Sequence, residues 1–114
     1  MSILVVEDNL DAAESLRDIL DLAGYSSVLA ENGNEVLEKF RPGLFRWVLL
    51  DLNIPGMRGQ ELIQRLFQVD PQVRIIVLTG NSVKEEIEGV SKLPVVGLLR
   101  KPYDPAKLLQ MISA

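Results

Sequence analysis

The feature of this sequence that most constrains its fold is a regular alternation of short apolar runs with amphipathic stretches. Five runs have the length and apolar content of buried strands: residues 2–6, 26–30, 46–50, 73–78 and 95–99. After each run comes a stretch in which apolar residues recur at helical spacing. Strands that alternate with helices, and that are apolar over most of their length, indicate a parallel sheet covered on both faces. We therefore expect an α/β fold: a doubly wound five-stranded parallel sheet with five helices, in a three-layer sandwich.

The ends of the expected helices carry residues that commonly begin and stop helices. Asn9 is a good N-cap for the first helix, and Gly24 ends it. The second helix is expected at 34–40, because Pro42 and Gly43 stop it there. The remaining signals mark a loop before the third helix, a short fourth helix and the cap of the fifth: Pro55-Gly56, 82–91 and Asp104.

The size and composition of the chain are those of an ordinary globular domain. It has 114 residues, of which 47% are apolar and 25% are charged. A chain of this length can bury a core without a structural metal or a disulfide. We find no internal repeat, low-complexity tract or interdomain linker, so we expect residues 1–114 to form one domain.

Missing residue types and the net charge exclude several functions. The sequence contains neither Cys nor His, which excludes disulfides, thiolate zinc sites, histidine metal ligands and a Ser-His-Asp triad. A net charge of −4 is a poor match for a module that binds nucleic-acid phosphates. No apolar run reaches the roughly 18–20 residues of a membrane helix, and the first residues lack a signal-peptide layout. We therefore expect a soluble, cytoplasmic domain with no direct nucleic-acid binding and no membrane insertion.

Polar residues follow four of the five expected strands. Glu7 and Asp8 come after the first strand, Asp51 after the third, Thr79 after the fourth and Lys101 after the fifth. Ligands of open α/β sheets bind beyond the carboxyl ends of the strands, and parallel strands bring those ends to one edge. The sequence thus predicts that three carboxylates, a hydroxyl and an ammonium meet at one edge of the sheet.

This combination of groups suits phosphoryl transfer. Three clustered carboxylates repel one another, and Mg²⁺ resolves the repulsion because it prefers oxygen ligands. Lys101 supplies a compact positive charge for phosphoryl oxygens, and Thr79 supplies a hydroxyl donor. A carboxylate can attack phosphorus when the transferring group is held in line and its charge is neutralised. The set therefore indicates phosphoryl transfer to Asp51.

Each of these residues has an ordinary explanation when it is taken singly. An acid after a strand usually forms a turn or caps a helix, as Asp8 can. Thr79 can be a turn residue, and Lys101 can be a solvated lysine. This explanation weakens for the whole set, because suitable residue types fall at four of five strand ends.

Four segments carry these residues in a characteristic order: ILVVEDN at 3–9, VLLDLNIPGM at 48–57 followed by Gly59, VLTG at 77–80 and KP at 101–102. Together they resemble the receiver domain of two-component response regulators, over residues 3–112. The resemblance implies the flavodoxin-like strand order 2-1-3-4-5. The run from Lys101 to Pro105 is similar to that of receivers in hybrid sensor kinases.

The resemblance implies a metal and a set of metal ligands. By position, Asp51 is the phosphoacceptor, and Glu7 and Asp8 are the acidic pair that holds Mg²⁺. The backbone carbonyl of Asn53 matches a further metal ligand. Asn53 and Asn81 occupy positions whose side chains tune the lifetime of the phosphoryl group in receivers.

The resemblance also implies partners and a switch. Thr79 matches the hydroxyl that turns toward the phosphoryl group, and Lys101 matches the lysine that binds it. The phosphodonor is expected to be a histidine kinase or a histidine phosphotransfer protein. Phosphorylation then changes the face built by the fourth helix, the fifth strand and the fifth helix, through which the domain can form a homodimer.

Two segments depart from the receiver pattern. Receivers commonly carry Tyr or Phe three residues before the lysine, where this chain has Leu98. Lys92-Leu93-Pro94 lacks the usual small residues, which predicts a short or irregular fourth helix. Two alternatives stay open: a pseudo-receiver that acts by protein contact alone, and a haloacid-dehalogenase-like phosphatase. That phosphatase family requires a second acid two residues after its nucleophile, where this chain has Asn53.

Overall fold

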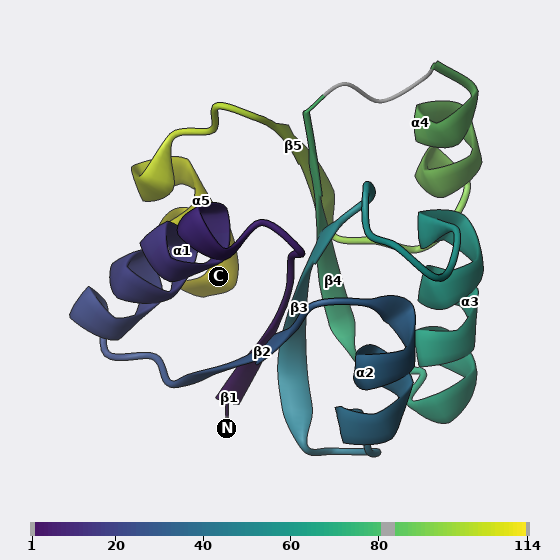
Figure 1. The fold of residues 1–114 in the computed structure, drawn as a ribbon, viewed down its shortest axis with the longest axis horizontal. Coiled ribbons are helices and arrows are strands. Elements are labelled where there is room, and N and C mark those ends of the chain that lie inside the picture. The colour runs from purple at the N-terminus through teal and green to yellow at the C-terminus, as the bar shows by residue number, and fades with distance from the viewer. Residues whose placement is uncertain (1, 81–83, 114) are drawn as a thin grey trace.

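The computed structural model describes residues 2–80 and 84–113, in which five strands alternate with five helices (Figure 1). The strands are β1 (Ser2–Val6), β2 (Ser27–Ala30), β3 (Phe45–Asp51), β4 (Arg74–Thr79) and β5 (Gly97–Arg100). The helices are α1 (Leu10–Leu22), α2 (Gly33–Lys39), α3 (Gly59–Val69), α4 (Lys84–Ser91) and α5 (Pro105–Ser113).

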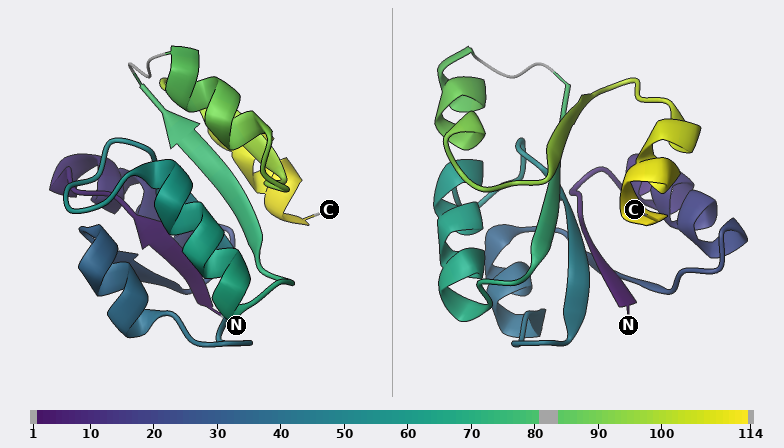
Figure 2. Two further views of the ribbon diagram at one scale, coloured as in Figure 1. Left: turned by 90° about the vertical axis from the view of Figure 1, so that its right-hand side faces the viewer. Right: turned by 180° about the vertical axis from the view of Figure 1, so that it is seen from behind.

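All neighbouring strands are parallel, and their order across the sheet is β2-β1-β3-β4-β5. Helices α1 and α5 cover one face, and α2, α3 and α4 cover the other (Figures 1 and 2). The expected fold class, strand order and three-layer arrangement are therefore confirmed. The sheet divides the interior into two apolar cores. In β1, for example, Leu4 and Val6 face the core under α2–α4, whereas Ile3 and Val5 face the core under α1 and α5.

The expected helix caps are present. The Asn9 side-chain oxygen accepts a hydrogen bond from the Ala12 N–H at 3.0 Å, and α1 begins at the next residue. Gly24 follows the end of α1 with a φ of 89°, a left-handed conformation that glycine adopts without steric cost. At α5, the Asp104 carboxylate accepts from the Ala106 N–H at 3.0 Å. The sequence therefore located these helix starts correctly.

Two elements differ from expectation for local reasons. The last strand begins at Gly97 rather than at residue 95, because the Val95 N–H bonds back to the Leu93 carbonyl at 2.8 Å around Pro94. The Val95 N–H is thus used in a tight turn centred on Pro94 and is not available to pair with β4. Helix α2 begins at Gly33, since Asn32 caps it through the Glu35 N–H at 2.9 Å. The fourth helix is short, as predicted, and the start expected at 82 lies outside the described residues.

A β-bulge interrupts the pairing of β1 with β3. Ser2 pairs with Phe45 and the next residue, Ile3, pairs with Trp47, so Arg46 is an extra residue in β3. A bulge of this kind re-aims the side chains around it. Phe45 and Trp47 consequently lie in different cores although they are two residues apart.

None of the helices in the described part of the chain has the length and apolar character required to cross a membrane.

Two leucines of α1 give a matched test of this packing. Leu20 is fully buried, whereas Leu22 is 89% exposed. We expect Leu20→Ala to lower the free energy of unfolding by about 2–5 kcal/mol, because it leaves a cavity under α1. Leu22→Ala should change it by less than about 0.5 kcal/mol. Urea unfolding followed by circular dichroism measures both, and equal effects would contradict the assigned orientation of α1.

Candidate functional site

The polar residues predicted to meet follow the carboxyl ends of four strands. Glu7 comes after β1, Asp51 ends β3, Thr79 ends β4, and Lys101 comes after β5. The strand order reverses between β1 and β3, so Glu7 and Asp51 flank the point where ligands of such sheets usually bind. Among the residues whose side-chain burial the structure describes, the buried polar or charged ones are Glu7, Asp51 and Thr79. The described chain thus buries its polar side chains at this one edge.

The Lys101 ammonium bridges two carboxylates. Its Nζ atom lies 2.5 Å from Oε1 of Glu7 and 2.6 Å from Oδ2 of Asp51. The side chains of Glu7 and Asp51 are each 6% exposed, and that of Lys101 is 29% exposed. The pairing is therefore largely shielded from water, where charge-assisted hydrogen bonds are strong. The backbone N–H of Lys101 also donates to the Thr79 carbonyl at 2.7 Å, which fixes the start of the Lys101 side chain.

Backbone amides hold the second oxygen of each carboxylate. The Asn53 N–H donates to Oδ1 of Asp51 at 2.8 Å, and the Asn9 N–H donates to Oε2 of Glu7 at 3.4 Å. In both cases the donor lies two residues after the acid, as in turns that acidic side chains form with their own backbone. These two amides were not predicted from the sequence, although an acid at a strand end followed by a loop is a usable signal for them.

The charges at this edge shift two pKa values. Burial raises the pKa of the Glu7 carboxyl above its ordinary 4.5; the Lys101 hydrogen bond opposes the rise, and Asp51 adds to it. Burial acts to lower the pKa of the Lys101 ammonium. The hydrogen bonds with Asp51 and Glu7 outweigh that effect and raise the pKa above its ordinary 10.5. Lys101 is therefore cationic at neutral pH.

Thr79 is buried at the same edge, and its hydroxyl forms no hydrogen bond with the described residues. Its side chain is 1% exposed, and Oγ1 has no hydrogen-bond partner among the described residues. A buried hydroxyl without a partner is costly, and such atoms often mark a functional position.

The remaining predicted residues are placed differently. Asp8 and Asn53 are exposed, and Asn81 lies outside the described residues. Within the part of the chain that the structure describes, no group of three or more Asp, Glu, His or Cys side chains is arranged to hold a metal ion. The structure thus brings together Glu7, Asp51 and Lys101, whereas Asp8 does not join them in a cluster.

Comparison with known proteins identifies the family. The family model for the response regulator receiver domain matches residues 3–113, and this chain belongs to that family, which acts in two-component signalling. A response regulator receiver protein of Anaeromyxobacter sp. (strain Fw109-5) is 33% identical over 108 residues, which cover 95% of this chain and 45% of that protein. The chain spans about half the length of several curated relatives that it matches.

Solved structures agree with this assignment. A CheY-like receiver domain protein from Methanospirillum hungatei JF-1 superimposes with a TM-score of 0.91 at 28% identity, over 98% of this chain and 90% of that one. A response regulator from Burkholderia pseudomallei gives a TM-score of 0.84 at 28% identity, over 96% of this chain and 65% of that one. That second structure contains a phosphorylated aspartic acid, a calcium ion and citrate.

Removing the Lys101 ammonium tests the bridge. Without Mg²⁺, Lys101→Met should lower the free energy of unfolding at neutral pH by about 1–3 kcal/mol, because two buried carboxylates lose their shared donor. Since folding raises the pKa of Lys101, its stabilisation is complete below 10.5 and is lost as pH rises through the folded-state value. The difference in the free energy of unfolding between wild type and Lys101→Met should therefore become smaller only in strongly alkaline solution. Urea unfolding at a series of pH values measures it.

Lys92→Met is the matched control, because Lys92 is exposed. It should be neutral within about 0.5 kcal/mol at every pH. A Lys101→Met variant that behaves like Lys92→Met would show that the bridge does not contribute to stability.

Replacing Thr79 tests its unpaired hydroxyl. Thr79→Val keeps the shape of the side chain but removes the polar atom, so we expect the unphosphorylated protein to gain about 1 kcal/mol of stability. Thr79→Ser keeps the hydroxyl and loses a methyl group, and it should be destabilising. Thermal and urea unfolding distinguish the two, and a destabilised Thr79→Val would mean that the hydroxyl has a stabilising partner.

Proposed function

We propose that residues 1–114 form one cytoplasmic receiver domain that accepts a phosphoryl group on Asp51 in a Mg²⁺-dependent reaction. The donor is a phosphohistidine of a histidine kinase or a histidine phosphotransfer protein. The observation that carries this proposal is the bridge from Lys101 to Asp51 and Glu7 at the edge where strand order reverses. The phosphorylated aspartic acid in the Burkholderia pseudomallei homologue supports the same chemistry for this chain.

The transfer moves a phosphoryl group from nitrogen to oxygen. One carboxylate oxygen of Asp51 attacks phosphorus, the bond from phosphorus to the imidazole nitrogen breaks, and the imidazole leaves with the bonding electron pair. The product on this chain is an acyl phosphate. Asp51 suits the role because Asn53 holds one of its oxygens through a backbone amide, which fixes the direction of the carboxylate.

Lys101 supplies positive charge where the transferred oxygens arrive. Its ammonium already contacts Asp51 Oδ2, so a phosphoryl group on Asp51 brings its oxygens within reach of the same cation. The position of Lys101 is held by its own backbone N–H bond to Thr79. The lysine therefore binds and orients the phosphoryl group without exchanging a proton with it.

The residues at this edge suit a magnesium ion. Glu7 and Asp51 share a single ammonium, which leaves a net negative charge in a poorly hydrated place. Together with the Asp8 carboxylate and the Asn53 backbone carbonyl they offer the hard oxygen donors that Mg²⁺ prefers. When bound, the ion would offset negative charge on the phosphoryl oxygens.

Phosphorylation changes the equilibrium between two states of the domain. The Thr79 hydroxyl has no hydrogen-bond partner among the described residues, and a phosphoryl oxygen on Asp51 offers it one. Reorientation of Thr79 then alters the face made by α4, β5 and α5, through which output partners or a second copy bind. The domain catalyses only its own phosphorylation and dephosphorylation.

Labelling with a small phosphodonor such as acetyl phosphate tests this function. Wild-type protein with Mg²⁺ should gain one phosphoryl group, and Asp51→Asn should gain none because an amide is not a nucleophile under these conditions. Chelation of Mg²⁺ should reduce labelling of the wild type severalfold or more. Intact-protein mass spectrometry measures each result.

Asp21→Asn is the matched control, because it makes the same chemical change at an exposed position of α1 and should label normally. Labelling of Asp51→Asn at the wild-type level would overturn the assignment of the acceptor. A wild type that never labels would instead favour a pseudo-receiver, and release of phosphate from many phosphomonoesters would favour a phosphatase.

A further inference from the structure

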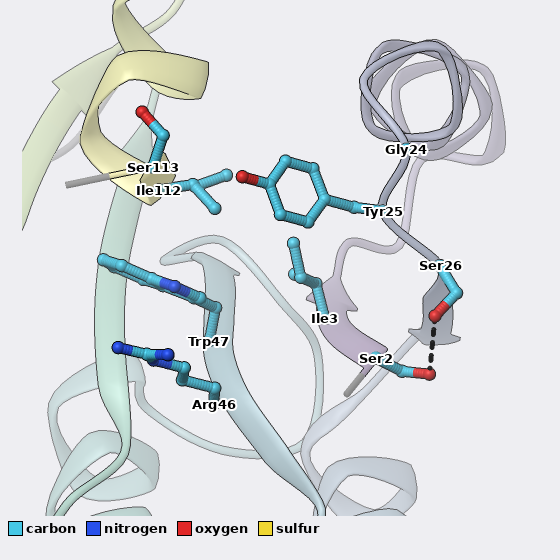
Figure 3. A pocket seen from close by; sticks show the side chains of 9 residues that line it. All are labelled: Ser2, Ile3, Gly24, Tyr25, Ser26, Arg46, Trp47, Ile112 and Ser113. Atoms are coloured by element: carbon cyan, nitrogen blue, oxygen red, sulfur yellow. Dashed lines mark hydrogen bonds between the residues drawn. The ribbon is translucent and has the colours of Figure 1, made fainter.

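A pocket lies at the edge of the sheet opposite Asp51, at the amino ends of the strands (Figure 3). Its volume is about 580 Å³, within the range of roughly 300–1,000 Å³ typical of small-molecule sites. It lies between the start of β3, the segment that joins α1 to β2, and the end of α5. Nine described residues line it: Ser2, Ile3, Gly24, Tyr25, Ser26, Arg46, Trp47, Ile112 and Ser113.

The lining of this pocket, which we call the Trp47 pocket, combines apolar and aromatic side chains with polar ones, the latter including three serines. The Trp47 indole and the Tyr25 ring lie on two sides, with Ile3 and Ile112 between them (Figure 3). Trp47 is 4% exposed and belongs to the core under α1 and α5, so its ring is held in place by packing. The accessible edge of the Trp47 ring and the partly exposed Tyr25 ring offer a flat apolar group a rigid surface, which it contacts with little loss of side-chain entropy.

Arg46 gives the Trp47 pocket its charge. Among the nine lining residues it is the charged one, although the chain as a whole has a net charge of −4. Its guanidinium lies alongside the Trp47 indole and projects in the same direction (Figure 3). Within the described residues Arg46 has no hydrogen bond or ion pair. A guanidinium beside an apolar wall is a ready partner for a carboxylate or phosphate.

The bulge in β3 explains this arrangement. In a regular strand, adjacent side chains point to opposite faces of the sheet, so Arg46 and Trp47 would point apart. Arg46 is the extra residue between the pairs Ser2–Phe45 and Ile3–Trp47. Its side chain therefore does not follow the alternation and points to the same side as Trp47 (Figure 3). Bulges often re-aim a side chain next to a functional site. Here the bulge places a cation at the rim of an aromatic pocket.

A second guanidinium strengthens the positive character of this edge. Arg74 lies over the Trp47 ring, with its Cζ atom 5.5 Å from the ring centroid. Arg46 and Arg74 also share the wall of an adjoining hollow. The same hollow contains the Asp70 carboxylate, which accepts hydrogen bonds from the backbone N–H groups of Gly43 and Gln72, both at 3.0 Å, and offsets part of the positive charge there.

We propose that the Trp47 pocket binds a small organic anion, one with a flat apolar part that packs on Trp47 and Tyr25 and a carboxylate or phosphate that pairs with Arg46. Trp47 and Asp51 are four residues apart in β3, roughly 13 Å at the usual rise per residue. The two sites therefore do not overlap, and this proposal stands independently of the phosphoacceptor role of Asp51.

Nitrogen–proton correlation spectra of the full chain, titrated with naphthoate, test the proposal. The chain has one Trp, so its indole N–H gives a single assignable signal inside the pocket. We expect saturable shifts of that signal and of the Tyr25, Ser26 and Ser113 amides. Neutral naphthamide should bind at least roughly tenfold more weakly, because it cannot form the charge-assisted bond. Naphthyl phosphonate in place of naphthoate shows which head group is preferred, and saturable binding of either one supports the proposal.

A charge-matched pair of variants assigns the anion contact. Arg46→Gln should weaken naphthoate binding roughly tenfold and leave naphthamide unchanged. Arg65→Gln removes the same charge from the exposed surface of α3 and should leave both unchanged. No saturable shift at millimolar naphthoate and phosphonate would overturn the proposal. So would equal binding of naphthoate and naphthamide, or an Arg46→Gln variant that binds naphthoate like wild type.

Discussion

The ammonium of Lys101 between the carboxylates of Glu7 and Asp51 is the interaction on which this edge of the protein depends. The two acids are almost entirely buried, and Lys101 contacts each of them at hydrogen-bond distance. Two buried like charges would repel each other at several kcal/mol if no cation lay between them. The bridge in turn depends on the strand order, because β2-β1-β3-β4-β5 puts the end of β1 beside the end of β3 and leaves β5 close enough to supply the lysine.

Polar side chains are buried at the carboxyl edge of the sheet, where the Lys101 bridge lies. Both faces of the sheet are covered by helices, so most side chains of β1, β3 and β4 contribute to apolar cores. The described chain departs from this pattern at Glu7, Asp51 and Thr79, each at or just after the end of a strand. Buried acids and an unpaired hydroxyl cost stability, and chains keep such groups mainly where they act. The extensive apolar packing of the sheet offsets that cost and holds the groups in register.

Features set by neighbouring residues in the chain, such as helix caps, could be predicted from the sequence more readily than features set by turns and strand pairing. Helix starts at Asn9 and Asp104 follow from side chains that bond the backbone within three residues, and they were predicted correctly. The convergence of Glu7, Asp51 and Lys101 followed from the rule that parallel strands share one edge. The late start of β5 at Gly97 depends on a tight turn around Pro94, which apolar content does not reveal.

The bulge at Arg46 was beyond sequence reasoning for a different reason. It is a property of the pairing between β1 and β3, two segments more than 40 residues apart in the chain, and not of either strand alone. In the sequence Arg46 is simply the first residue of the strand expected at 46–50, and its residue type does not reveal the bulge. The extra residue in β3 turns the Arg46 side chain so that it lies alongside Trp47 (Figure 3). The strand-end pattern therefore predicted that Glu7, Asp51 and Lys101 meet at the carboxyl edge of the sheet, whereas no sequence pattern predicted the arrangement of Arg46 and Trp47 at the amino edge.

Leu98 bears on how a signal could leave the proposed phosphorylation site. It pairs with Val77 in the neighbouring strand and packs, partly buried, against the core under α2–α4. An aliphatic side chain has no hydroxyl to satisfy, so a move of Leu98 would neither break nor form a hydrogen bond. Thr79, by contrast, has no partner for its hydroxyl among the described residues, and in the proposed mechanism a phosphoryl oxygen on Asp51 would supply one. The difference in free energy between the two states would therefore come mainly from Thr79 and Lys101, with Leu98 following by packing.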